Sequence, residues 1–154
     1  MKTYKRKEVI PLHDRMYEFP CVFLWGKKRR GNEMEIKIIN SLFSVCKIED
    51  ISKVNFKDEY WFLSKTDEEL SLVCQTKYVP ENNIACENGW RAFRIQGILD
   101  FSLIGILSKI STLLAEHKIS IFAVSTFNTD YILVKESQFE LALDILNKAG
   151  YNIV

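Results

Sequence analysis

The sequence has few of the residues that mark a catalytic or metal site. It contains two histidines, His13 and His117, and shows no Ser-His-Asp or Cys-His arrangement, no GxxxxGK or GxGxxG motif and no metal-ligand cluster. The four cysteines have neither CxxC spacing nor nearby histidines, which favours free thiols in a reducing cytoplasm; they are Cys21, Cys46, Cys74 and Cys86. We therefore expect a non-catalytic cytoplasmic protein with no metal and no cofactor.

Long apolar runs are also missing. No stretch reaches the 18 residues or so that a membrane helix needs, and Arg15, Glu18 and Pro20 interrupt the only early apolar patch. A net charge of +1 gives no general attraction to nucleic acid or to an acidic membrane. With three prolines, six glycines and 47% hydrophobic residues, the 154-residue chain has the composition of one ordinary domain or two small ones.

Charge is distributed unevenly. Residues 1–33 hold nine basic and four acidic residues, a net charge of +5, and include the run Lys27–Arg30. This basic N-terminal extension has three interpretations: a nucleic-acid contact, a solvated linker, or sequence upstream of a true start at Met34. The nucleic-acid contact is the least favoured, so neither nucleic acid nor a membrane is an expected partner.

The clearest pattern lies at residues 89–154, where the hydrophobic period alternates between strand and helix. We expect a short strand at 92–97, a helix at 102–118 with one apolar face, and an antiparallel hairpin of strands 119–126 and 131–135. Because both faces of 119–126 are apolar, that strand is predicted to be central in the sheet.

A second helix should follow the hairpin. Ser137 and Glu140 form a capping-box pattern, and Gly150 occupies the usual position after a helix C-terminus. Residues 151–154 can add a last strand. The order predicts a split βαββαβ unit of ferredoxin-like type, with a four-stranded antiparallel sheet and both helices on one face.

The preceding stretch, residues 34–80, contains short strands and no amphipathic helix. The expected strands are 35–39, 43–48, 60–65 and 70–75, with a turn at Thr66–Glu69. Such a small unit should pack against the second one, because it buries too little surface alone. The polar residues 81–88, between Pro80 and Gly89, are interpreted as a connector.

Several of these runs resemble the ACT-domain family. The resemblance is dense over residues 89–150, in Gly89–Ala92, Gly97–Gly105, Ile119–Thr126 and Thr129–Glu136, and thinner over 34–80, in Phe43–Cys46 and Thr66–Cys74. The chain is similar to the regulatory ACT pair of aspartate kinases and to CASTOR-type arginine sensors. The resemblance implies an α+β fold of two tandem ACT-like units, the first reduced at 34–80 and the second at 89–154.

The residues alone suggest a place for a small molecule. Residues 97–105 pass from a strand into a helix N-terminus, whose free amides suit a carboxylate, and Asp130 offers a carboxylate to an ammonium group. An α-amino acid carries both charges. The alternatives are that Asp100 or Ser102 only caps the helix and that Asp130 only stabilises its turn.

The resemblance implies a fuller site at an interface between ACT units. One side would consist of Thr126, Phe127, Thr129 and Asp130, and the other of Asp100, Phe101, Ser102, Leu103 and Gly105. With one tandem pair per chain, the complete site needs a homodimer, and any regulatory output needs a separate partner protein. The alternative functions are a ligand-free interaction protein of the same fold and a small ferredoxin-like enzyme.

Overall fold

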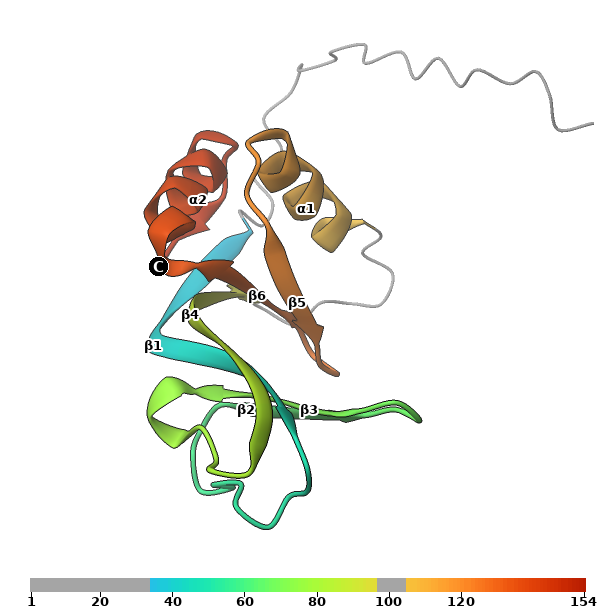
Figure 1. Ribbon diagram of the computed structural model, residues 1–154. Coiled ribbons are helices and arrows are strands. Elements are labelled where there is room, and N and C mark those ends of the chain that lie inside the picture. Colours follow the sequence, from blue (N-terminus) through green and yellow to red (C-terminus); the bar gives the residue numbers. More distant parts are fainter. Residues whose placement is uncertain (1–33, 97–104) are drawn as a thin grey trace, which may run out of the picture. The chain divides into compact units, whose positions relative to one another are not determined.

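The computed structural model describes residues 34–96 and 105–154, which belong to one compact unit of the chain (Figure 1). Its elements are β1 (Glu35–Ile48), β2 (Trp61–Lys65), β3 (Leu70–Gln75), the 3-10 helix η1 (Thr76–Tyr78), β4 (Asn83–Gln96), α1 (Ile106–Glu116), β5 (Ile121–Ser125), β6 (Asp130–Lys135), α2 (Glu136–Lys148) and β7 (Asn152–Ile153). No helix among the described residues is long and apolar enough to cross a membrane.

The strands form one sheet in the order β2-β3-β1-β4-β6-β5, and β7 pairs with β1. All pairings are antiparallel except that of β7 with β1, which is parallel. The α+β class and the β5–β6 hairpin are therefore confirmed. The expectation that β5 is a central strand is wrong, because among the described strands β5 ends the sheet and pairs with β6 alone.

Two long strands, β1 and β4, form the middle of the sheet. The two strands expected at 35–39 and 43–48 are one continuous strand, β1, whose pairing with β4 shifts register after Ile39 and again after Phe43. Such irregularities bend a strand without ending it. The predicted connector 81–88 is wrong as a loop, because β4 begins at Asn83 and pairs with β1 through Asn83, Ala85, Cys86 and Glu87.

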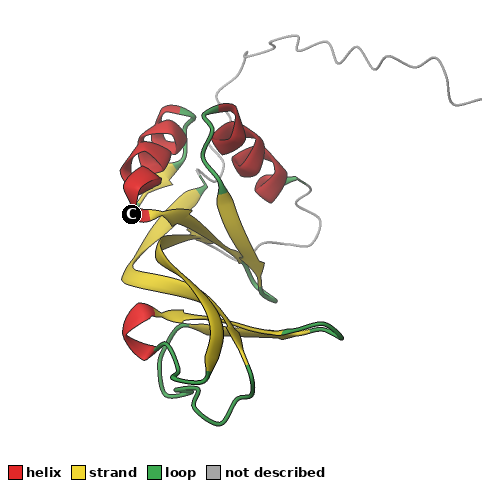
Figure 2. Ribbon diagram, in the orientation of Figure 1, coloured by secondary structure: helices red, strands yellow, loops and turns green. Residues whose placement is uncertain are grey.

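Both helices lie on one face of the sheet, as expected (Figure 2). Ile110 and Leu114 of α1 and Phe139 and Leu146 of α2 are fully buried on that face. The predicted capping box at Ser137 is not formed: α2 begins at Glu136, directly after β6, and its N-cap is Lys135 with no side-chain cap. Gly150, with φ of 94°, follows the helix end as predicted.

The sheet beneath the helices contains a strand from the first unit. Ile36 of β1 is fully buried in the helix-side core, and β1 lies between β4 and β7. The prediction that residues 89–154 supply a complete four-stranded antiparallel sheet is therefore wrong. Strand β7 does join the sheet, as expected, but its partner is β1 and the pairing is parallel.

The first three strands repeat the arrangement of β4, β5 and β6. From the centre outward the sheet reads β1-β3-β2 on one side and β4-β6-β5 on the other. Phe43 and Trp90 pair with each other at the centre. On their other sides, Phe43 pairs with Gln75, the last residue of β3, and Trp90 pairs with Lys135, the last residue of β6. The first unit is thus a partial copy of the second.

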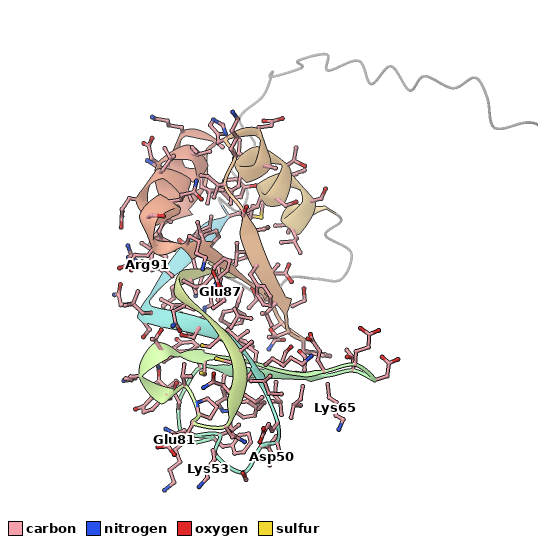
Figure 3. All side chains as sticks on the ribbon, viewed as in Figure 1. Asp50, Lys53, Lys65, Glu81, Glu87 and Arg91 are labelled. Carbon is pink, nitrogen blue, oxygen red and sulfur yellow. The ribbon has the colours of Figure 1, made fainter. Side chains whose placement is uncertain are left out.

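The copy is reduced because it lacks the two helices. The loop 49–60 stands where the second unit has α1, and η1 stands where it has α2. Asp50 fixes this loop: its Oδ1 accepts hydrogen bonds from the Ser52 amide at 2.7 Å and from Asn82 Nδ2 at 3.2 Å. Hydrogen bonding from the Ser52 side chain, and then from its amide, lowers the pKa of Asp50. Asp50, Lys53 and Glu81 lie at the end of the unit away from the helices (Figure 3).

Aromatic side chains join the two halves on the face opposite the helices. Phe62 of β2 lies 4.9 Å from Tyr131 of β6 between ring centroids, and Tyr60 lies 6.5 Å from the same ring. These contacts link strands far apart in the sheet order, so the sheet curls over itself around Phe43, Val73, Trp90 and Leu133. The first unit therefore packs against the second, as its small size predicts.

Candidate functional site

The β5–β6 turn, residues 126–129, is held by three hydrogen bonds between its two threonines. The Thr126 amide and Thr126 Oγ1 donate to the Thr129 carbonyl, at 2.9 and 2.7 Å, and the Thr129 amide donates to Thr126 Oγ1 at 3.4 Å. Threonine hydroxyls commonly close turns in this way. Both threonines predicted as site residues therefore have a role in shaping the turn.

Thr129 also joins this turn to the end of β4. Its side chain is 9% exposed, and its Oγ1 donates to the Ile95 carbonyl at 2.5 Å. Ile95 lies one residue before the C-terminal end of β4, from which the chain continues toward α1. The structure thus brings the β5–β6 turn to the end of the sheet from which the strand-to-helix segment departs.

The other predicted residues at this end divide into described and undescribed ones. Gly105 is the N-cap of α1, with φ of 82°, a left-handed conformation that favours glycine. Gly105 itself has no side chain that could satisfy the first amides of the helix. The remaining predicted residues on this side, Asp100, Phe101, Ser102 and Leu103, lie outside the described residues, as does the expected helix start at Ser102.

Two predicted residues flank the turn. Asp130 is the first residue of β6, is partly buried and pairs with Ser125 across the hairpin. Phe127, at the tip of the turn, is 81% exposed. The strand pairing thus fixes the backbone position of Asp130. The ring of Phe127 lies at the surface.

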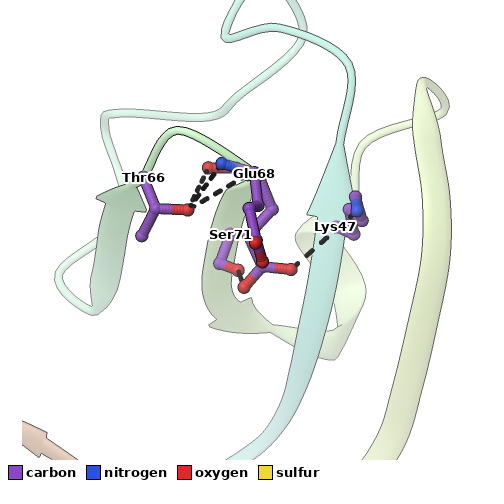
Figure 4. A network of polar contacts seen from close by, with 5 residues as sticks. Lys47, Thr66, Glu68 and Ser71 are labelled. Atoms are coloured by element: carbon purple, nitrogen blue, oxygen red, sulfur yellow. Dashed lines mark hydrogen bonds and ion pairs between the residues drawn. The ribbon is translucent and has the colours of Figure 1, made fainter.

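The first unit has a counterpart of this turn, with different chemistry. The Thr66 amide donates to the Glu69 carbonyl at 2.9 Å, as Thr126 does to Thr129. Glu69 occupies the place of Thr129, and its carboxylate accepts a hydrogen bond from Ser71 Oγ at 2.9 Å and lies 4.0 Å from Lys47 Nζ (Figure 4). An exposed ion pair therefore replaces the buried hydroxyl, so the two turns are not equivalent sites.

Hollows elsewhere on the surface do not coincide with the predicted site. One of about 710 Å³ lies at the other end of β5, next to the C-terminal half of α1, and is lined by Ser111, Thr112, Ala115, Lys118, Ile119, Ser120 and Ile121. Across residues 34–96 and 105–154, no group of three or more His, Cys, Asp or Glu side chains is placed to hold a metal ion.

Sequence reasoning missed the partner that positions Thr129. The acceptor is a backbone carbonyl, which every residue possesses, so no side-chain pattern points to Ile95. It also missed the close approach of Cys46 and Cys86, which pair across β1 and β4.

Residues 85–148 match the family model of the ACT domain, which confirms the resemblance. No curated protein matches the chain. A solved structure of a protein from Agrobacterium tumefaciens is 29% identical, with a TM-score of 0.72 over 80% of this chain and 94% of the other.

Two further solved structures share the fold at lower identity. A Vibrio cholerae protein of unknown function, described as a possible transport protein, is 19% identical, with a TM-score of 0.60 over 75% of this chain and 89% of its own. The ligand-free regulatory subunit of aspartate kinase from Thermus thermophilus is 9% identical, with a TM-score of 0.56 over 77% and 99%.

Proposed function

We propose that this chain, which contains an ACT domain at residues 85–148, is a non-catalytic regulatory module that binds an amino acid or a similar small molecule. The proposed site lies where β4 ends and the β5–β6 turn begins. The family match supports the regulatory class, and the shared fold with an aspartate kinase regulatory subunit agrees with it.

The observation that carries the proposal is the hydrogen bond from Thr129 to the Ile95 carbonyl. It ties the β5–β6 turn, which belongs to the predicted site, to the end of β4, which directly precedes the predicted strand-to-helix segment 97–105. A buried hydroxyl-to-carbonyl bond fixes the separation of such segments, because breaking it leaves an unsatisfied polar group in the core.

The chemistry at this end suits a zwitterion. The α1 N-terminus offers amide donors and the positive end of the helix dipole to a carboxylate. Asp130, on the neighbouring hairpin, offers a carboxylate to an ammonium group. In the proposed site, Thr126, Phe127 and Thr129 line the hairpin side and Gly105 the helix side.

The proposed assembly is a homodimer in a reducing cytoplasm. A second chain would complete the site, because a hairpin and a helix end on one surface leave a ligand open to solvent. Strand β5, whose outer edge is unpaired among the strands of residues 34–96 and 105–154, is available for such an assembly. The three described cysteines are free thiols, which agrees with a reducing setting. Regulatory output would pass to a separate partner protein.

A thermal-shift screen of the full chain against the twenty amino acids and common nucleotides tests the proposal. A ligand at about 100 times its dissociation constant should stabilise the protein by about 2.7 kcal/mol. Light scattering should give the mass of a dimer at micromolar concentration. If no amino acid or nucleotide raises the melting temperature at millimolar concentration, the sensor function is wrong and a ligand-free interaction module takes its place.

A further inference from the structure

We propose that Cys46 and Cys86 form an oxidisable dithiol, a modification site that a peroxide converts into a disulfide across the central strands. The two residues are direct partners in the antiparallel pairing of β1 and β4. Their Sγ atoms are 2.9 Å apart. A disulfide bond is about 2.05 Å long, so the sulfur atoms need to approach by about 0.9 Å. This inference is independent of the proposed amino-acid site.

The surroundings restrict which thiols can react. Cys46 lies in a row of directly paired residues that crosses four strands, from Leu63 through Leu72 to Cys46 and Cys86. Cys46 is 2% exposed, whereas Cys86 is only partly buried. A hollow of about 420 Å³, also lined by Lys47 and Phe122, reaches both cysteines. Cys86 is therefore the thiol that a small oxidant meets first.

The missing helices explain why this pair can be reached. Cys46 is the counterpart of Phe93, because these residues pair with Leu72 in β3 and Ile132 in β6, respectively. Phe93 packs against Phe139 of α2, with ring centroids 6.2 Å apart, and is fully buried. Within the part of the chain that the structure describes, no α-helix covers the corresponding face of the first unit, and Cys86 is only partly buried.

A third cysteine, Cys74, lies close by but is not the proposed partner. It is 4% exposed, and its thiol raises the pKa of Cys46. In the sheet, Cys74 is the direct partner of Ser44, so it lies diagonally across from Cys46. Cys86 is the direct partner of Cys46. Directly opposed residues of an antiparallel pair have the shorter separation, which matches the reach of a disulfide.

The chemistry balances with hydrogen peroxide as the oxidant. The Cys86 thiol releases its proton and the thiolate attacks one peroxide oxygen, which breaks the O–O bond and forms a sulfenic acid. The leaving hydroxide takes up the released proton and becomes water. Cys46 sulfur then attacks Cys86 sulfur, the S–O bond breaks, and the departing hydroxide takes the Cys46 proton as a second water. Two thiols lose two electrons in total, and one peroxide becomes two waters.

Oxidation has a structural consequence beyond the bond itself. The Cys86 thiol donates to Asn88 Oδ1 at 3.2 Å, and Ser44 Oγ donates to the same oxygen at 2.7 Å. The Asn88 carbonyl accepts from Lys135 Nζ at 2.8 Å. A disulfide removes the hydrogen bond that the Cys86 thiol donates to Asn88. The position of Asn88, and with it the bond from Lys135 of β6, should therefore depend on the redox state.

The test uses the full chain with Cys21 replaced by serine, so that Cys46, Cys74 and Cys86 are the only thiols. Hydrogen peroxide should lower the mass by about 2 Da, for the two hydrogens lost, and dithiothreitol should restore it. Peptide mapping should show Cys46 linked to Cys86. A linkage through Cys74, sulfenic or sulfinic acids alone, or no change in mass would each overturn the proposal.

Two further substitutions provide matched controls in the same background. Cys86→Ser should abolish the 2 Da loss. Cys74→Ser should form the disulfide at a rate within about twofold of that of the Cys21→Ser parent, because Cys74 is outside the dithiol. Far-UV circular dichroism and a melting curve establish that each variant is folded before oxidation. The proposal would be wrong if Cys86→Ser formed a disulfide at the parent rate. It would also be wrong if folded Cys74→Ser formed none.

Discussion

Thr129 Oγ1 donates a 2.5 Å hydrogen bond to the Ile95 carbonyl and so fastens the β5–β6 turn to the end of β4. Thr129→Val keeps the shape of the side chain and removes the donor. Because the carbonyl is left without this partner in a buried place, the variant should lose about 1–3 kcal/mol of unfolding free energy in urea.

Thr129→Ser is the matched control, since it keeps the hydroxyl and loses one methyl group. It should retain most of the stability, with a loss of about 1 kcal/mol or less. Equal stability of Thr129→Val and the wild type would show that the bond does not position the turn, and it would remove the main support for the proposed site.

Residues 83–154 should not fold by themselves. Strand β7 is held by β1 through the Val154 amide, which donates to the Ile36 carbonyl at 2.9 Å, and the Ile38 amide, which donates to the Val154 carbonyl at 3.0 Å. A fragment of residues 83–154 lacks β1, exposes the edge of β4 and loses the buried Ile36. Its proton–nitrogen correlation spectrum should have the narrow dispersion of an unfolded chain, and well-dispersed peaks would contradict the expectation.

Much of the fold beneath the helices could be read from the sequence, because it depends on local periods. The buried positions Phe139, Ala142 and Leu146 follow the 3.6-residue repeat, and the β5–β6 hairpin follows from two apolar runs separated by a polar turn. The place of β1 could not be read in this way. Its apolar alternation marks a strand but does not say which strands lie beside it.

The candidate site divides in the same way. Thr126 and Asp130 were predicted as site residues because they lie in and beside a turn that resembles the family's binding segment, and their role in binding stays a prediction. The role of Ile95 depends on a backbone group, and the approach of Cys46 to Cys86 depends on a pairing across 40 residues. Both are consequences of strand register, which single-residue patterns do not specify.

Asp130→Asn tests the proposed anchor of the amino acid. The substitution keeps the shape and removes the charge, and a charge-assisted hydrogen bond contributes about 1.5–3 kcal/mol. Affinity measured by titration calorimetry should fall about 10- to 100-fold. Stability without ligand should stay near that of the wild type.

The turn of the first unit supplies the control for this experiment. Asp67→Asn makes the same chemical change in the β2–β3 turn, where Thr66 forms the corresponding bonds. It should leave ligand affinity unchanged. A variant Asp130→Asn that binds as tightly as the wild type but unfolds more easily would limit Asp130 to a structural role in its turn.

Oxidation of the proposed dithiol should raise stability. The bond would close a loop of 40 residues, for which the chain-entropy relation gives about 4 kcal/mol. Urea unfolding of the Cys21→Ser protein, oxidised and then reduced, measures the difference directly. Strain across the paired strands would reduce this gain, and an oxidised protein less stable than the reduced one would show that the β1–β4 pairing cannot accept the bond.

Alkaline pH should destabilise the reduced protein through the same residues. Burial raises the pKa of Cys86 to about 11, and the hydrogen bond with Cys74 raises the pKa of Cys46 beyond its usual range. The neighbouring Glu87 also raises the pKa of Cys86, whereas Ser44 lowers it. Both thiols therefore hold their protons in the folded state at pH values where the unfolded chain releases them.

The sign of the effect follows from this difference in bound protons. Between pH 9, the ordinary thiol value, and about pH 11, the folded state binds more protons than the unfolded state, so unfolding free energy falls as pH rises. Cys74 acts in the opposite direction, because the same hydrogen bond from Cys46 lowers its pKa. The comparison is therefore made in the Cys21→Ser, Cys74→Ser background, with and without Cys86→Ser. Between pH 8 and 11, the unfolding free energy measured in urea should fall more steeply with pH when Cys86 is present. If it falls equally in both proteins, the pKa of Cys86 is the same in the folded and unfolded states.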